Sequence, residues 1–203
     1  MAAGARFTGY GPGETLTRWK QELRNLAPEP IPESGPLRLP TRDIPANWIG
    51  HDGRVTESRY FQLIGDANDT LLRSIGVDDK YRSRYGGYQT LETHMRNLGG
   101  LRSGDSAEVL TQVLGADDRI LHLFHAIKRE GDEAPAATSE QVLLHIAAGS
   151  GRSEPAQGNV RERVIQLAHQ HADLPRPERT RAKLGSGEQI QQPLLMREFG
   201  WRS

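Results

Sequence analysis

The sequence predicts an α+β domain in which one long helix is followed by several consecutive strands. All 12 prolines lie before residue 46 or after residue 134, so residues 46–134 can form regular structure without interruption. Within this stretch, apolar residues first recur at helical spacing, over 56–75, and then alternate with polar residues from residue 88 onwards. A run of strands joined by short turns implies antiparallel pairing, which is typical of the α+β class.

The first 36 residues are expected to form an extension of the domain. Residues 15–26 have the apolar spacing of one face of a short helix. The dense prolines between residues 28 and 36 then exclude both helix and central strand and favour an extended linker. We therefore expect the domain itself to span residues 37–148.

The long helix is predicted to run from Thr56 to Ile75. Its apolar face repeats every three or four residues, and the members of this face are Tyr60, Ile64, Ala67, Leu71 and Ile75. Thr56 is a natural N-cap, and Gly76 marks the end of the helix. Because the apolar face is wide, we expect other structure to wrap around this helix.

The residues after the helix predict four strands, which span 88–96, 107–114, 120–127 and 141–146. In the first strand, Thr90, Glu92 and His94 alternate with other residues, so the three are expected to share one face. If that face lines a substrate pocket, Glu92 and His94 could bind or activate an amine, with Thr90 and Tyr88 beside them. The alternative is an exposed pair on the outer face of the sheet.

A last helix is expected in the C-terminal part, residues 149–203. Asn159 and Glu162 have the three-residue spacing of a capping box. The residues that follow on one face are Val160, Val164, Leu167 and His171. The chain beyond Leu174 is rich in Pro and Arg, so this tail is expected either to pack on a partner or to be disordered.

Composition excludes several classes of function. The chain has 26 basic and 26 acidic side chains, so net charge gives no reason to expect binding to nucleic acid or to an anionic membrane. The absence of Cys excludes disulfides, thiolate nucleophiles and Cys-ligated metals, and it favours a reducing, cytoplasmic compartment. No apolar run approaches the ~20 residues of a membrane span. The seven His residues form no recognisable metal-ligand spacing, so we expect neither metal nor cofactor.

The most informative stretch is IPANWIGHDGRVTESRYFQLIGDANDTLLRSIG, at residues 44–76. Here a Gly-rich polar loop leads directly into the N-terminus of the long helix. A helix N-terminus presents unpaired N–H groups and a partial positive charge. These groups can polarise a carbonyl and stabilise an oxyanion.

This segment resembles the hotdog-fold acyl-thioesterases, in which an antiparallel sheet wraps around a long helix. The resemblance continues through GGYQTLETHMRNL, TQVLGADDRILHLFH and ATSEQVLLH, at residues 86–98, 111–125 and 137–145. The sequence is similar to the betainyl-CoA thioesterases of carnitine breakdown. The resemblance implies an acyl thioester substrate, carried by coenzyme A or an acyl carrier protein. It also implies an active site at the interface of a homodimer or larger assembly.

The loop departs from the family pattern at two positions. Gly50 stands where the family has the Asp that serves as nucleophile or general base, and Arg54 stands where it has a His. His51 and Asp52 remain as candidate catalytic residues. A neutral His is a competent base near pH 7, and a neighbouring carboxylate can raise its basicity. The alternatives are that Asp52 only orients the loop and that His51 only packs against the sheet.

The residues that follow are expected to bind the thioester. Gly53, Arg54, Val55 and Thr56 are the expected oxyanion and thioester-binding residues. Arg54 could also attract a carboxylate or a phosphate. In the first helical turns, Glu57 and Tyr60 are second-rank candidates for shaping the pocket, and the alternatives are a solvated Glu57 and a core Tyr60.

The GHDG loop, residues 50–53, also resembles dual-function thioesterases of natural-product biosynthesis. These enzymes add glycine to a 2-enoyl thioester in a Michael addition and then hydrolyse the product to an N-carboxymethyl-β-amino acid. We expect this dual function first. The alternatives are hydrolysis of betainyl-CoA or another acyl-CoA, and a non-catalytic module that only binds acyl groups.

Overall fold

The computed structural model describes residues 35–39, 41–178 and 180. The helix predicted within residues 15–26, most of the Pro-rich linker and the tail after residue 180 lie outside the described residues.

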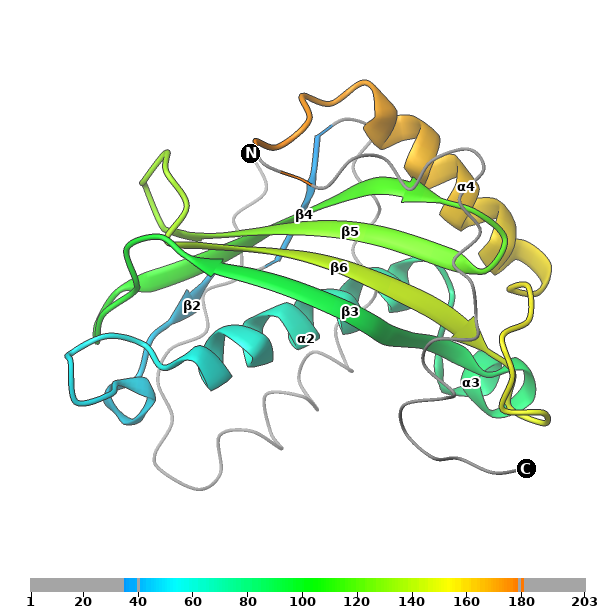
Figure 1. Ribbon diagram of the computed structural model, residues 1–203, viewed down its shortest axis with the longest axis horizontal. Helices are drawn as coiled ribbons and strands as arrows, with labels where there is room; N and C mark the ends of the chain where they lie inside the picture. The colour runs from blue at the N-terminus through cyan, green and yellow to red at the C-terminus, as the bar shows by residue number, and fades with distance from the viewer. Residues whose placement is uncertain (1–34, 40, 179, 181–203) are drawn as a thin grey trace.

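A single antiparallel sheet and the helices packed against it form the body (Figure 1). The elements in chain order are β1 (Leu37–Arg38), β2 (Arg42–Asp43), the 3-10 helix η1 (Ala46–Trp48), α2 (Glu57–Ser74), α3 (Asp79–Tyr85), β3 (Gly87–Asn97), β4 (Ser106–Ala116), β5 (Ile120–Arg129), β6 (Ala137–Ile146) and α4 (Gly158–Ala172). The strand order is β1-β4-β5-β6-β3, and β2 also pairs with β4. Helix α2 lies along one face of the sheet and α4 lies beside β4, which confirms the predicted α+β class.

Both predicted ends of α2 are confirmed to within a residue. Thr56 occupies the N-cap position with extended backbone, although its side chain makes no capping hydrogen bond. Gly76 follows the last turn with φ of 99°, a conformation that favours glycine, and its N–H donates to Arg73 O. The helix therefore starts and stops where local signals in the sequence placed it.

The core beneath α2 is divided by a polar connection. One apolar cluster surrounds the first turns of α2, and a second surrounds its last turns. Between them Asn68 Nδ2 donates to Gln141 Oε1 at 2.7 Å, and Gln141 Nε2 donates to Thr93 Oγ1 at 2.8 Å. A chain of hydrogen bonds thus joins α2, β6 and the edge strand β3 through the middle of the core.

Strand β3 contains a bulge that changes which side chains share a face. Thr90 pairs with Leu143, a core residue beneath α2, and the register then shifts by one residue before Glu92. Directly paired residues lie on the same face of a sheet, so Thr90 faces α2 whereas Glu92 and His94 face the opposite side. The prediction that Thr90, Glu92 and His94 share one face is therefore wrong, because the extra residue, Leu91, interrupts the alternation.

Helix α4 packs beside β4 and against the C-terminal end of α2, where a Cβ atom at Gly76 would lie 3.5 Å from Val160 Cγ2. It begins at Gly158 with Gln157 at the N-cap, so the predicted capping box of Asn159 and Glu162 is wrong: Asn159 already lies in the first turn. The predicted buried face is confirmed, and its members are Val160, Val164, Leu167 and His171. The three apolar members join the buried cluster that contains Leu37, so α4 extends the core of the domain.

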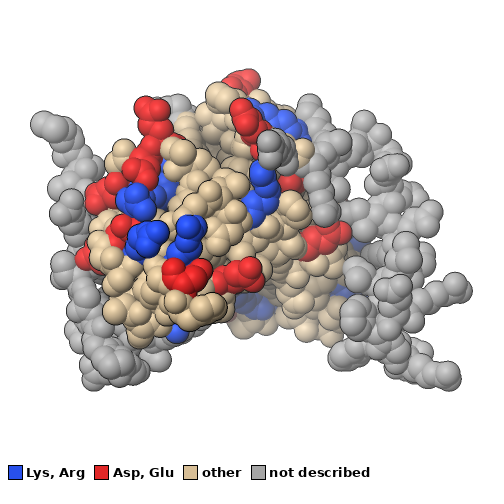
Figure 2. Space-filling model, turned by 60° about the vertical axis from the view of Figure 1, so that its left-hand side comes forward, with Lys and Arg blue, Asp and Glu red and all other residues tan. Residues whose placement is uncertain are grey.

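Charged side chains of both signs are mixed on the surface. On the face drawn in Figure 2, Lys and Arg side chains are interspersed with Asp and Glu side chains.

Among the helices of the described residues, none combines the length and the apolar character that a membrane crossing requires.

Candidate active-site loop and the neighbouring cleft

The loop before α2 is a closed turn held by its own backbone. Gly50 N–H donates to Arg54 O at 2.8 Å, and Gly53 N–H donates to Gly50 O at 3.1 Å. Gly53 has φ of 74°, which lets the chain reverse at this point. His51 and Asp52 lie exposed at the tip of this turn, immediately before the N-terminus of α2.

The carboxylate of Asp52 lies beside Gly50. A Cβ atom added at Gly50 would lie 3.3 Å from Asp52 Oδ1. The same Oδ1 accepts the backbone N–H of Arg54 at 3.1 Å, so the carboxylate also orients the turn. The loop therefore carries a carboxylate within reach of the space into which a side chain at residue 50 would project.

His51 has no hydrogen-bond partner within the described part of the chain, and its side chain is exposed. The structure therefore contains no hydrogen bond between His51 and Asp52. The imidazole is free to meet a ligand, but nothing in the described residues orients it.

The backbone N–H groups of the expected oxyanion residues are already engaged in this structure. The acceptors are Gly50 O for Gly53, Asp52 Oδ1 for Arg54, Leu101 O for Val55 and Trp48 O for Thr56. These hydrogen bonds fix the loop against the rest of the domain.

The next two N–H groups along the chain, those of Glu57 and Ser58, have no partner among the described residues. They form the first turn of α2, where backbone donors are left over by helix geometry. The following donor, Arg59 N–H, bonds to Thr56 O at 3.0 Å. The donors at the helix terminus that remain free are therefore those of Glu57 and Ser58.

Two side chains tie the loop and α2 to the segment after β3. Arg54 Nη1 donates to Gly99 O at 2.7 Å, and its aliphatic part passes over Gly100. Tyr60 is fully buried, and its hydroxyl accepts Leu101 N–H at 2.7 Å. Burial raises the pKa of Tyr60, which keeps the phenol neutral. Both residues hold the loop in place, and Tyr60 lies in the core.

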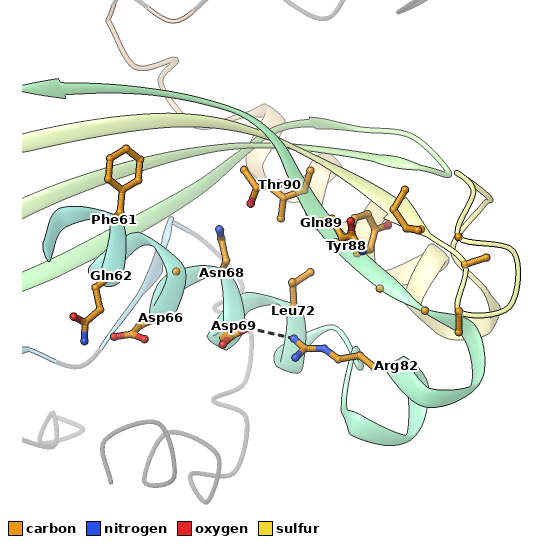
Figure 3. Close-up of a pocket in the computed structure, with 18 residues that line it drawn as sticks. Phe61, Gln62, Asp66, Asn68, Asp69, Leu72, Arg82, Tyr88, Gln89 and Thr90 are labelled. Carbon is orange, nitrogen blue, oxygen red and sulfur yellow. Dashed lines mark hydrogen bonds and ion pairs between the residues drawn. The ribbon is translucent and has the colours of Figure 1, made fainter. Parts of the chain in front are cut away.

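A cleft of about 740 Å³ lies between α2 and the start of β3 (Figure 3). Two of the expected substrate-binding residues, Tyr88 and Thr90, line it. Asn68 also lines it, and the ion pair of Arg82 with Asp69, at 3.2 Å, lies in its wall. The cleft begins one turn into α2, and none of the loop residues lines it.

Glu92 and His94 belong to a different surface. They lie on the outer face of the sheet, where His94 pairs across from Glu140. On that face His122 Nε2 and Glu140 Oε1 form a buried contact of 2.7 Å. The structure thus separates these two residues from Tyr88 and Thr90.

In the described residues, no group of three or more His, Cys, Asp or Glu side chains could hold a metal ion.

Sequence reasoning missed the buried polar groups of residues that line the cleft. Asn68 is 8% exposed, and among the described residues neither its Oδ1 nor the buried hydroxyl of Tyr88 has a hydrogen-bond partner. Burial raises the pKa of Tyr88, so this hydroxyl stays protonated. The available signal was an Asn four residues after Ile64, a position on the side of the helix that packs against the sheet.

Comparison with known proteins identifies the family. The model of the thioesterase-like superfamily matches residues 44–164, which include the loop, α2, the main strands and the start of α4. The chain belongs to this thioesterase-like superfamily. Its sheet and central helix are those of the hotdog thioesterase fold, as predicted.

Sequence relatives of this thioesterase-like chain carry names from carnitine metabolism. The L-carnitine dehydrogenase/betainyl-CoA thioesterase of Rhizobium meliloti is 36% identical over 181 residues, which are 88% of this chain and 36% of the relative. The betainyl-CoA thioesterase of Pseudomonas aeruginosa is 37% identical over 143 residues, or 69% of this chain and 90% of the relative. The chain thus spans about a third of the length of the first of these relatives.

Solved structures of thioesterases share the fold. A putative thioesterase from Pseudomonas putida matches with a TM-score of 0.62 and 28% identity, over 77% of this thioesterase-like chain and 99% of the other. A Staphylococcus aureus protein solved in complex with CoA matches with a TM-score of 0.68 over 76% of this chain and 97% of its own. At 21% identity, this second likeness concerns the fold alone.

Proposed function

We propose that this protein hydrolyses acyl thioesters and that Asp52 supplies the carboxylate for the reaction. The observation that carries the proposal is the 3.3 Å separation between Asp52 Oδ1 and the Cβ position of Gly50. In the thioesterases that this chain resembles, the catalytic Asp occupies the position that corresponds to Gly50. A carboxylate two residues later in the same turn therefore reaches the same space, and it compensates for Gly50.

The chemistry follows from the arrangement of charge in the loop. Asp52 uses Oδ1 to orient the turn, which leaves Oδ2 to accept a proton from water or to attack the thioester carbonyl. The free N–H groups of Glu57 and Ser58 at the N-terminus of α2 stabilise the oxyanion. Gly53, Arg54, Val55 and Thr56 hold the turn that positions these groups. His51 is the second candidate base, because it lies exposed beside Asp52.

Coenzyme A is the proposed carrier of the acyl group, with an acyl carrier protein as the alternative. Betainyl-CoA is the first substrate to test, because relatives at 36% and 37% identity are named for its hydrolysis. We place the reaction in the cytoplasm, where acyl-CoA is formed and used.

A homodimer is part of this proposal. Strand β3 is an edge of the sheet, and no strand in the described residues pairs with its outer side. An unpaired edge of this length is a ready template for a second copy of the chain. Sedimentation or light scattering at micromolar concentration tests this, and a monomer would refute it.

The second candidate is the dual function, in which glycine adds to a 2-enoyl thioester before hydrolysis. The observation that favours it is the GHDG loop itself, since Gly50 leaves room and His51 offers a base for an amine nucleophile. In this reading Arg54 attracts the glycine carboxylate with the guanidinium nitrogens not bonded to Gly99 O. The outer-face residues Glu92 and His94 are proposed to take part only if a partner chain brings them to the substrate.

One assay separates these functions. The protein is incubated with betainyl-CoA and with crotonyl-CoA, each with and without glycine, while free thiol and product mass are followed. An equal rate of thiol release with and without glycine supports simple hydrolysis, whereas a glycine adduct supports the dual function. Binding without any thiol release would refute both and leave a non-catalytic acyl-binding module.

A further inference from the structure

Helix α2 has a glycine in its middle that the packing of the domain does not explain. Gly65 lies well inside the 18-residue helix Glu57–Ser74, and it is exposed. Outside its own helical turns, no atom of the described residues lies within 4 Å of the position that a Cβ atom would occupy. Glycine in a helix interior is less stable than alanine, and its usual function is to allow a close approach to the backbone. Since the described chain makes no such approach at Gly65, the open space is available to a ligand.

Gly65 lines the cleft between α2 and β3, next to an exposed aromatic ring. Phe61, one turn earlier, also lines this cleft and is 47% exposed. Figure 3 shows the Phe61 side chain projecting from α2 towards the strands. Residues four apart lie on the same side of a helix, so a side chain at position 65 would project in nearly the same direction. The missing side chain therefore leaves an accessible notch in the cleft, flanked by an apolar surface.

Thr90 lies on the opposite wall of the cleft. It pairs with the core residue Leu143, so it faces α2, and yet it is exposed. Helix α2 thus leaves this part of the sheet uncovered, and the space between the notch and Thr90 is open to a ligand.

The notch lies at a defined distance from the proposed oxyanion donors. Gly65 is about 10 Å further along the axis of α2 than Ser58, whose free N–H belongs to these donors. An extended carbon chain advances about 1.2 Å per bond, as a polypeptide backbone does, so an acyl chain of about eight carbons spans this distance. Along α2, the lining of the cleft starts at Phe61, in the turn after Ser58. An acyl chain that leaves the oxyanion site along α2 therefore enters the cleft and ends at the notch.

We propose that the cleft takes the chain of a medium-chain acyl thioester and that Gly65 makes room for the end of this chain. The inference rests on the proposed thioesterase function. The acyl chain lies between the ring of Phe61 and the wall formed by β3, where each carbon removed from water contributes to affinity. A larger side chain at position 65 would occupy the end of this path and shorten the acyl chain that fits. Gly65 thus determines chain-length specificity.

The length of the path distinguishes among candidate substrates. A betainyl group is short, so it would end beside Phe61 and leave the notch at Gly65 unfilled. An octanoyl group would reach the notch. A medium-chain acyl-CoA is therefore the tighter ligand.

The test measures binding apart from hydrolysis. S-ethyl-CoA and S-octyl-CoA are thioethers that cannot be hydrolysed, and they differ only in the length of the alkyl chain. Isothermal titration calorimetry on the full chain is expected to give a dissociation constant about tenfold lower, or lower still, for the octyl compound. Equal affinities, tighter binding of the ethyl compound, or no binding of either would overturn the inference.

Variants then identify the residue responsible. Gly65→Leu is expected to weaken the binding of S-octyl-CoA by about tenfold or more and to leave that of S-ethyl-CoA unchanged. Thr70→Leu is the matched control, because it adds the same side chain to α2 at a residue that does not line the cleft, and it should keep the preference. A Gly65→Leu variant that binds both compounds as the wild type does would overturn the role of Gly65. Equal weakening of both compounds would place the carrier arm at Gly65 in place of the acyl chain and would also overturn it.

Stability and mass measurements separate the loss of space from the loss of fold. Since nothing in the described chain obstructs a side chain at position 65, Gly65→Ala is expected to raise the equilibrium constant for folding about 2- to 5-fold in urea unfolding. A destabilised Gly65→Ala variant, or a Gly65→Leu variant that sediments at a lower mass than the wild type, would assign the glycine to packing and overturn the inference. If no thioester releases thiol while the chain-length preference is present and depends on Gly65, the thioesterase proposal fails and the assignment of Gly65 stands.

Discussion

Asp52 Oδ1 lies 3.3 Å from the position that a Cβ atom at Gly50 would occupy. The turn from residue 50 to residue 54 brings the two positions together, since Gly50 N–H bonds to Arg54 O while Asp52 Oδ1 accepts Arg54 N–H. A carboxylate lost from one position of a tight turn can thus be replaced from another.

His51→Ala is expected to lower kcat by less than about tenfold. The imidazole is exposed and has no partner within the described residues, so nothing holds it against a substrate. General bases typically contribute about 10²- to 10⁴-fold to the rate. Steady-state kinetics with the best acyl-CoA checks this. A loss of a hundredfold or more, with unchanged thermal stability, would assign the base to His51.

Tyr60→Phe is expected to destabilise the fold by about 1–2 kcal/mol, because it leaves the buried N–H of Leu101 without an acceptor. Urea unfolding measures this difference. Tyr85→Phe is the control, since no hydrogen bond of the Tyr85 hydroxyl occurs in the described structure, and its effect should be small. Equal stabilities of Tyr60→Phe and wild type would show that the hydroxyl does not brace the segment after β3.

Gly86→Ala is expected to be among the most damaging small substitutions, costing more than about 4 kcal/mol. A Cβ atom there would lie 1.9 Å from Ile146 O and 2.7 Å from Ala148 N, and backbone cannot move aside as a side chain can. Gly104→Ala is the control, because Gly104 also has positive φ, of 83°, but nothing lies within 4 Å of its Cβ position. It should lose only about 1–2 kcal/mol. Similar effects for the two variants would contradict the close approach.

Stability is expected to fall as the pH drops below about 6.5. Burial lowers the pKa of His125 from 6.5 to about 4, and it also lowers the pKa of His145 and His171. Below pH 6.5 the unfolded chain therefore binds protons that the folded chain does not, and stability is lost down to about pH 4. His125 alone accounts for at most about 3 kcal/mol over this window.

The measurement is urea unfolding at several pH values between 4 and 8. The slope of the free energy of unfolding against pH reports how many more protons the unfolded chain binds. His125→Gln should lower this number by about one, whereas His169→Gln, at an exposed position on α4, should leave the slope unchanged. A wild-type stability that is flat from pH 7 to pH 4.5 would contradict the assignment of buried, neutral histidines.

Local signals explain most of what the sequence predicted correctly. Helix α2 was predicted within a residue at each end because its apolar period and Gly76 act over a few neighbouring residues. Helix α3 was missed because it has seven residues and no apolar repeat; its single signal is Asp78, whose side chain caps Tyr81 N–H. The start of β6 was placed at Gln141, four residues late, because the polar residues before it do not resemble a buried strand.

The site was harder to predict because it depends on pairing and three-dimensional proximity. The bulge at Leu91 follows from the register of β3 against β6, which no alternation within β3 reveals. The contact between Asn68 and Gln141 joins residues 73 positions apart. The resemblance placed the loop correctly before α2, but only the geometry of the turn shows that Asp52 reaches towards Gly50.

The most direct test moves the carboxylate back. Asp52→Asn keeps an oxygen to accept Arg54 N–H, so it should leave the fold intact while lowering kcat by about 10²- to 10⁴-fold. Adding Gly50→Asp to this variant places a carboxylate in the same space from the other position. We expect the kcat of the double variant, measured by thiol release from the best acyl-CoA, to be at least tenfold higher than that of Asp52→Asn. Full activity of Asp52→Asn would contradict the catalytic role of Asp52, and so would a double variant no more active than Asp52→Asn alone.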